Sequence, residues 1–232
     1  PSVRRVLCPT GRSMPTQKQP RSRPIPVRSL KPASEGSHPV TLRNRHVTWV
    51  AQVLAPDLIR LRVVRGREIP ETPSWAVVPG SWTEPTVRVT RQRSTLSLET
   101  PVGRWTMSLA TGAWDVTDGH GIQVFSSPPG GLTLTGAEMT LNLDLVDGES
   151  VFGLGEATGS FNRRGRVRDF WNIDVLGHAP AIHPGLQQLY VSIPFAVSLR
   201  DGRAAGVFWD NPARQQWDLG PTQRDRWTLK AA

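Results

Sequence analysis

The sequence predicts an all-β domain in which antiparallel strands form a two-layered β-sandwich. Several segments alternate apolar and polar residues, which is the period of a strand that buries one face. Turn sequences rich in Gly, Pro and Asp recur between these segments at the spacing typical of short antiparallel strands. No segment has a convincing helical period, so two packed antiparallel sheets account for the pattern best.

The first predicted strands are 47–53 and 58–64. Both are rich in β-branched residues, and the turn sequence Ala55-Pro56-Asp57 separates them. Later segments that alternate large apolar residues with polar neighbours lie at 96–98, 105–109 and 141–145. A Gly-containing turn signal follows the last of them, as expected for a strand that ends in a hairpin.

The C-terminal part of the chain predicts one long strand at 187–199. The sequence Arg-Asp-Gly-Arg at 200–203 predicts a hairpin turn into a further strand at 205–209. Asp210 and Asn211, which are followed by proline, predict a turn after that strand.

Charge and proline content divide the chain near residue 40. Residues 1–40 hold eight Lys and Arg residues against one acidic residue, a formal +7, with eight of the 21 prolines and no Phe, Trp or Tyr. Such a segment cannot bury enough apolar area to offset its ordering entropy, so we expect 1–40 to be a disordered, solvated basic tail. Nucleic-acid binding is not expected, because the basic residues are not interleaved with aromatic ones. Residues 41–232, with all nine tryptophans, are long enough for one large β domain.

Cysteine content and hydropathy indicate the cellular compartment in which we expect the protein. The single cysteine, Cys8, cannot form a disulfide within the chain. No apolar run approaches the roughly 20 residues of a membrane helix, and the first residues lack the apolar core of a signal peptide. We therefore expect a cytoplasmic protein without a membrane partner.

The segment from Val151 to Asp174, VFGLGEATGSFNRRGRVRDFWNID, is the most distinctive in the chain. It starts as a strand, continues as a Gly- and Arg-rich loop and ends in a Trp-Asn-x-Asp cluster. A long loop on a rigid β scaffold is where binding groups usually lie. Its arginines suit either a solvated turn or a clamp that anchors the loop to an acidic neighbour; they are Arg163, Arg164, Arg166 and Arg168.

Five motifs, in this order, carry a resemblance: FGLGE at 152–156, RRGR at 163–166, WNID at 171–174, LYVSIPF at 189–195 and GVFWDNPA at 206–213. Together they resemble the N-terminal domain of glycoside hydrolase family 31, which contains α-glucosidases and α-xylosidases. The resemblance implies a β-sandwich of the galactose-mutarotase-like type ahead of a (β/α)8 catalytic barrel. It also implies retaining hydrolysis by two aspartates at barrel strand ends. This sequence contains no barrel pattern, so we expect no catalytic residue in it and no activity from it alone.

The resemblance also implies a substrate-binding loop, placed at 156–186. The matching residues are Trp171, Asn172 and Asp174, of which the aspartate helps to bind the sugar beside the cleaved bond. An ionised carboxylate can accept hydrogen bonds from two adjacent hydroxyls, and an indole can cover the C–H face of a pyranose. The alternative roles are packing of the loop for Trp171 and capping of a turn for Asn172. Glu156 suits a structural anchor that pairs with one of the arginines.

The expected ligand is an α-glucoside or a related oligosaccharide, and the expected protein partner is the family's own barrel domain. Phe152 and Ile173 stand where tyrosine and threonine are commoner in the family, so the sugar and the linkage stay open. An uncovered docking face would be apolar, which also allows a homo-oligomer. No cofactor or metal is expected, because His178 and His183 share a loop without a third ligand.

Two other functions stay open. One is a non-catalytic carbohydrate-binding β-sandwich module, which a solvent-exposed row of aromatic residues on one sheet would favour. The other is an aldose epimerase, since the sandwich type is shared, with His120 as acid and Asp118 as base.

Overall fold

The computed structural model describes residues 23–33, 38–70, 74–78, 80, 82, 85–174 and 188–232. These residues form eighteen β-strands and no helix, and the strands pair in antiparallel fashion. The predicted all-β antiparallel class is therefore confirmed. Within the described ranges, no helix is long and apolar enough to cross a membrane.

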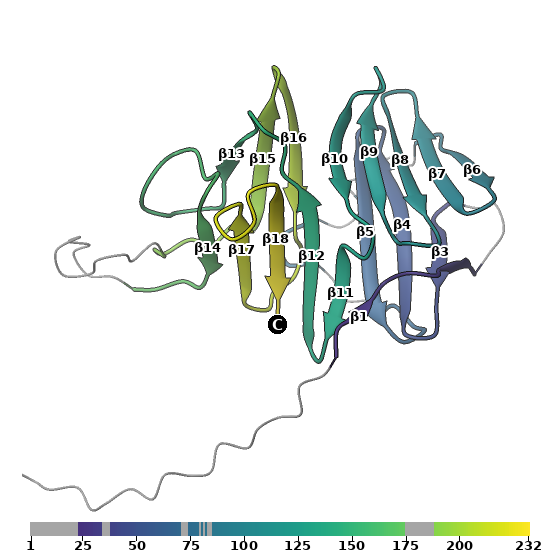
Figure 1. Cartoon of the computed structure of the whole chain (residues 1–232), viewed down its shortest axis with the longest axis horizontal. Coiled ribbons are helices and arrows are strands. Elements are labelled where there is room, and N and C mark those ends of the chain that lie inside the picture. Colours follow the sequence, from purple (N-terminus) through teal and green to yellow (C-terminus); the bar gives the residue numbers. More distant parts are fainter. Residues whose placement is uncertain are drawn as a thin grey trace, which may run out of the picture.

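The strands form four sheets (Figure 1). The six-stranded sheet has the order β1 (Ile25–Pro26), β11 (Leu132–Thr135), β12 (Glu138–Asp144), β18 (Arg226–Ala231), β17 (Gln215–Leu219) and β14 (Val167–Phe170). The three-stranded sheet has the order β13 (Ser150–Gly153), β15 (Phe195–Arg200) and β16 (Arg203–Phe208). Figure 1 shows most of these strands on one side of the molecule.

The other two sheets lie on the opposite side in Figure 1. The five-stranded sheet has the order β10 (Gln123–Ser127), β9 (Trp114–Asp118), β8 (Gly103–Ser108), β7 (Thr95–Thr100) and β6 (Arg88–Gln92). The four-stranded sheet has the order β2 (Lys31–Pro32), β3 (Val40–Arg43), β4 (Val47–Ala55) and β5 (Leu58–Arg65). The predicted strands at 47–53 and 58–64 are thus β4 and β5.

One core cluster includes residues from all four sheets. Phe125 of β10 meets Trp227 of β18 edge to face, with ring centroids 6.1 Å apart, and this contact joins the five- and six-stranded sheets. Trp49 of β4 and Trp105 of β8 are each at most 2% exposed. The alternation predicted at 96–98, 105–109 and 141–145 is confirmed, because most of its apolar residues are buried: Leu96, Leu98, Trp105, Met107, Leu109, Leu143 and Leu145.

Residues 23–33 cross from the six-stranded sheet to the four-stranded sheet, and we name this segment the strap. Its strand β1 pairs with β11 and its strand β2 pairs with β3. Between them Val27 and Leu30 are 1% and 4% exposed. The Val27 amide donates to the Leu132 carbonyl at 2.9 Å and the Leu30 amide donates to the Leu109 carbonyl at 2.8 Å.

The prediction of disorder over all of 1–40 is therefore wrong for the strap, and β3 begins at Val40. The prediction gave too much weight to the high proline content. Pro26 and Pro32 lie in two-residue strands at sheet edges, where a missing N–H is tolerated. Residues 1–22 and 34–37 of the predicted tail lie outside the described residues.

The long strand predicted at 187–199 is only partly correct. The strand β15 starts at Phe195, and before it only Gln188 makes an isolated bridge, to Ala157. Pro194 has no N–H to give to a ladder, so regular pairing cannot run through it. The segment before Pro194 instead pairs its backbone with the loop that follows β13.

Candidate functional site

The FGLGE motif forms a tight backbone turn at the end of β13. Gly153, Leu154 and Gly155 have positive φ values of 101°, 73° and 72°. A Cβ at Gly153 would lie 2.7 Å from the carbonyl oxygen of Phe195, and one at Gly155 would lie 2.5 Å from that of Val191, so both positions require glycine. Leu154 is held in this unusual conformation by a fully buried side chain and by an amide that donates to Phe195 at 2.9 Å. The turn is therefore fixed against the segment that leads into β15.

Arg168 on β14 ties this turn to the strand that carries the Trp-Asn-x-Asp cluster. It is 3% exposed, and its Nε and Nη2 donate to the carbonyl oxygens of Leu154 and Glu156 at 3.4 and 2.6 Å. Burial lowers the pKa of the Arg168 guanidinium, which nevertheless stays charged at neutral pH. The Glu156 carboxylate accepts from the Tyr190 amide at 3.2 Å. Glu156 is thus a loop anchor with a backbone donor.

Two further arginines hold the loop. Arg163 donates to three carbonyl oxygens within 157–160 at 2.9 to 3.2 Å. Arg164 donates to the Val146 carbonyl at 2.6 Å and reaches the exposed carboxylate of Asp147 at 3.5 Å, a distance typical of a weak surface pair. Of the two predicted readings, the clamp is correct for these arginines, but its main targets are backbone oxygens rather than an acidic neighbour. The sequence could not distinguish these targets.

The Trp-Asn-x-Asp cluster begins where β14 ends. Phe170 is buried against Trp217, with ring centroids 5.4 Å apart. The next residue, Trp171, is 56% exposed. The guanidinium carbon of Arg214 lies 5.4 Å from the centroid of the Trp171 ring, which is a cation–π contact. Trp171 therefore lies outside the core, with its indole beside a cation.

Asn172 and Asp174 are both exposed, whereas Ile173 between them is partly buried. The Ile173 amide donates to the Leu189 carbonyl at 3.0 Å, so the backbone of this extended segment is held while its polar side chains meet solvent. The fold thus brings Trp171, Asn172 and Asp174 onto one exposed stretch, and their contact with sugar stays a prediction. Residues 175–187, with His178 and His183, lie outside the described residues.

An apolar surface covers the outer face of the hairpin β15–β16. Cross-strand register pairs Phe195 with Phe208, Val197 with Gly206 and Leu199 with Ala204, all on one face. We name these six residues the Phe195–Phe208 face. Its three largest members at the hairpin ends are 39–40% exposed: Phe195, Leu199 and Phe208. Tyr190, Val191 and Ile193, which precede this hairpin in the chain, are 44–50% exposed.

Comparison with known proteins decides the family. The model of the glycosyl hydrolase 31 N-terminal galactose mutarotase-like domain matches residues 48–218. The chain belongs to glycosyl hydrolase family 31. The sequence resemblance and the predicted galactose-mutarotase-like domain are thereby confirmed.

Relatives of this family 31 domain are much longer than the chain. Alpha-glucosidase 2 of Bacillus thermoamyloliquefaciens is 30% identical over 117 residues, which are 50% of this chain and 14% of that protein. The alpha-glucosidase of Saccharolobus solfataricus is 32% identical over 85 residues, 37% of this chain and 11% of that protein. A Flavobacterium johnsoniae GH31 dextranase structure has a TM-score of 0.73 and 25% identity, over 83% of this chain and 23% of the dextranase.

The aldose epimerase alternative finds no support in this family 31 domain. Asp118 Oδ1 accepts from the His120 and Ile122 amides, both at 2.9 Å, and Oδ2 accepts from Arg203 Nε at 3.2 Å. The hydrogen bond from the Ile122 amide is the main cause that lowers the pKa of Asp118. Asp118 is therefore a turn cap rather than a base. The turn predicted at Asp210 and Asn211 is confirmed, since Asn211 Oδ1 accepts from the Ala213 amide at 2.8 Å.

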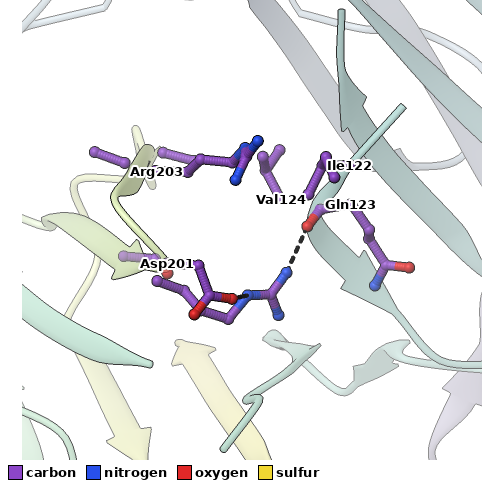
Figure 2. Close-up of a pocket in the computed structure, with 9 residues that line it drawn as sticks. Ile122, Gln123, Val124, Asp201 and Arg203 are labelled. Atoms are coloured by element: carbon purple, nitrogen blue, oxygen red, sulfur yellow. Dashed lines mark hydrogen bonds and ion pairs between the residues drawn. The ribbon is translucent and has the colours of Figure 1, made fainter. Parts of the chain in front are cut away.

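A small pocket lies between the turns of the β9–β10 and β15–β16 hairpins (Figure 2). Arg200 Nη2 donates to the Gln123 carbonyl at 2.6 Å, and Arg203 is engaged by Asp118. Both guanidinium groups hold the five-stranded sheet to the three-stranded sheet, so the pocket is a junction between sheets. In the described part of the chain, no group of three His, Cys, Asp or Glu side chains could hold a metal ion.

Arg168→Met is expected to destabilise the domain by about 1–3 kcal/mol for each carbonyl oxygen that it leaves without a donor. Arg168→Lys should destabilise the domain less, because an ammonium group can replace some of the hydrogen bonds that the guanidinium donates. Urea unfolding of both variants measures the difference, with the exposed Arg166→Met as control. Equal stability of Arg168→Met and the parent chain would show that the clamp does not hold the loop.

Proposed function

We propose that the chain is the N-terminal domain of a retaining α-glycosidase of the α-glucosidase type. In this proposal the domain presents a substrate-binding loop and a docking surface to a (β/α)8 barrel of the same polypeptide. The barrel supplies the two catalytic aspartates, and the domain alone is inactive. Membership of family 31 and the α-glucosidase relatives support this function.

The exposed stretch Trp171–Asn172–Ile173–Asp174 is the observation that carries the proposal. Its base is rigid, because Arg168, the positive-φ turn and the Ile173–Leu189 hydrogen bond fix the backbone on both sides. Its free groups match a sugar: a carboxylate for paired hydroxyls, an amide that donates and accepts, and an indole for the C–H face. A site held by a rigid scaffold loses little entropy when it binds.

The Phe195–Phe208 face is the surface proposed to meet the barrel. It has no polar side chain among its six positions, and monomeric proteins rarely expose contiguous apolar patches of this kind without a partner. It also continues through Tyr190 and Val191 to the backbone that fixes the FGLGE turn. A barrel seated there would lie next to the base of the substrate loop.

A carbohydrate-binding module without catalysis is the second candidate. Three exposed tryptophans favour it, at 94%, 40% and 56% exposure: Trp75, Trp82 and Trp171. Against it, five of the nine tryptophans are at most 8% exposed: Trp49, Trp105, Trp114, Trp217 and Trp227. The Phe195–Phe208 face is built from phenylalanine, aliphatic residues and glycine, which lack the polar edge of a sugar platform.

The double variant Phe195→Ser/Phe208→Ser tests the docking surface. Sedimentation velocity of the 232-residue chain is expected to show concentration-dependent association, which the double variant reduces because the apolar face is lost. In the polypeptide that includes the barrel, the same variant should lower the melting temperature of the barrel. Val102→Ser, at a separate site with 46% exposure, is the control. A monomer at all concentrations together with an unchanged barrel would reject the surface.

A further inference from the structure

We propose that Arg214 is a positioning residue for Trp171, which it holds so that only one face of the indole is open to a sugar. This inference rests on the proposed function, in which the ring belongs to the substrate loop. Arg214 lies outside every motif that carried the family resemblance, and no sequence pattern connects it to the loop.

The register of two neighbouring strands brings the pair together. β14 and β17 lie side by side in Figure 1 and pair in antiparallel fashion, with Phe170 opposite Gln215. Trp171 directly follows β14 and Arg214 directly precedes β17, so the two residues flank the end of this pairing. Side chains directly opposite each other in an antiparallel pair share a face and have Cβ atoms about 4.5–5.5 Å apart. The pairing brings the two residues close to each other, and the guanidinium carbon lies 5.4 Å from the ring centroid.

The backbone at Arg214 is held by hydrogen bonds of its own carbonyl and of its neighbour Gln215. The Arg214 carbonyl accepts from the Ala232 amide at 3.1 Å. Its neighbour Gln215 is 2% exposed, and Gln215 Nε2 donates to the Trp209 and Asn211 carbonyls at 3.2 and 2.6 Å. These contacts brace the segment between β16 and β17.

The ring of Trp171 is the recorded contact of the Arg214 guanidinium among the described residues. None of the six ion pairs among the described residues includes Arg214. A planar guanidinium stacks on an aromatic face better than an ammonium does, and it excludes a second planar or sugar group from that face. The ligand class is then a pyranose whose C–H face stacks on the opposite side of the indole, next to the Asp174 carboxylate.

The first test is spectroscopic and needs no substrate. Near-UV circular dichroism of the 232-residue chain should change on Arg214→Ala, because the Trp171 ring loses its fixed orientation. The difference should vanish when Trp171→Phe is compared with the double variant Trp171→Phe/Arg214→Ala. In the parent background, Arg214→Lys should give a smaller spectral change than Arg214→Ala. Arg224→Ala is the matched control, since Arg224 is an exposed arginine whose guanidinium is 3.9 Å from Asp147 and is in neither cation–π contact of the described residues.

The second test is kinetic, in the glycosidase that carries this domain, with 4-nitrophenyl α-D-glucopyranoside. Arg214→Ala should raise KM about two- to fivefold, the equivalent of an exposed cation–π contact, and leave kcat nearly unchanged. In a Trp171→Ala background the same change should have no effect on KM, which a double-mutant cycle detects.

The outcomes separate the two proposals. If Asp174→Asn impairs catalysis but Arg214→Ala alters neither the spectrum nor KM, the positioning role is wrong and the substrate loop stands. If Arg214→Ala alters the spectrum but no variant of Trp171 or Asp174 alters KM, Arg214 does orient the Trp171 ring, and the proposed function of the loop is wrong. An equal rise in KM with and without Trp171 also contradicts positioning through the ring.

Discussion

In the α-glycosidase proposed to carry this domain, Asp174→Asn is expected to lower kcat/KM for α-glucosides by about 10- to 150-fold, while the fold survives. The change removes a negative charge that accepts hydrogen bonds from sugar hydroxyls, and such bonds contribute about 1.5–3 kcal/mol. Asp174 is exposed, so its replacement leaves the core intact. Steady-state kinetics with 4-nitrophenyl α-D-glucopyranoside give the ratio, and thermal unfolding verifies the fold.

Asp169→Asn is the matched control for this prediction. Asp169 lies on β14, five residues before Asp174, and its carboxylate accepts from Gln216 Nε2 at 2.9 Å within the sheet. An amide oxygen can keep that hydrogen bond, so kinetics should stay within twofold of the parent enzyme. Equal losses in both variants would attribute the effect to charge in general rather than to a sugar contact by Asp174.

Val27→Ala/Leu30→Ala is expected to destabilise the domain by about 3–6 kcal/mol, a large fraction of the 5–15 kcal/mol typical of a folded domain. Both side chains are buried where the strap joins the six- and four-stranded sheets, and truncation leaves cavities that neighbouring strands cannot fill. Guanidinium chloride unfolding measures the loss as a lower midpoint.

The control for the strap is Arg28→Ala, an exposed residue between the two buried ones. It should change the free energy of unfolding by less than about 0.5 kcal/mol, as surface substitutions usually do. A double variant as stable as this control would mean that the strap rests on the sheets without stabilising them.

Much of the fold could be predicted because period-2 alternation is strong in the long strands. β7 and β8 follow it, and their apolar residues belong to the core. β4 and β5 could be predicted from their β-branched residues and the turn sequence between them. The strap could not be predicted, since β1 and β2 are two residues long and a period needs several residues. In the same way, the segment before Pro194 looks like a strand in sequence, but the Val191 carbonyl accepts from the amide of Glu156, at the end of the FGLGE motif.

The residues of the candidate site also differ in whether the sequence could predict them. Trp171, Asn172 and Asp174 could be named from their motif; all three are exposed, and their contact with sugar stays a prediction. Arg214 could not, because only the pairing of β14 with β17 places it on the ring. The Phe195–Phe208 face could have been recognised from residue size. The small residues Ala196 and Ser198 point inward, while the large residues of the same strand point outward. A strand with bulky residues on its outer face predicts a partner surface.

The most direct test is a crystal structure of the barrel-containing enzyme with an unreactive α-glucoside analogue bound. A carboxylate oxygen of Asp174 should lie within about 2.5–3.2 Å of a hydroxyl of the sugar next to the scissile position. An Asp174 carboxylate more than about 6 Å from every atom of that sugar would contradict the account.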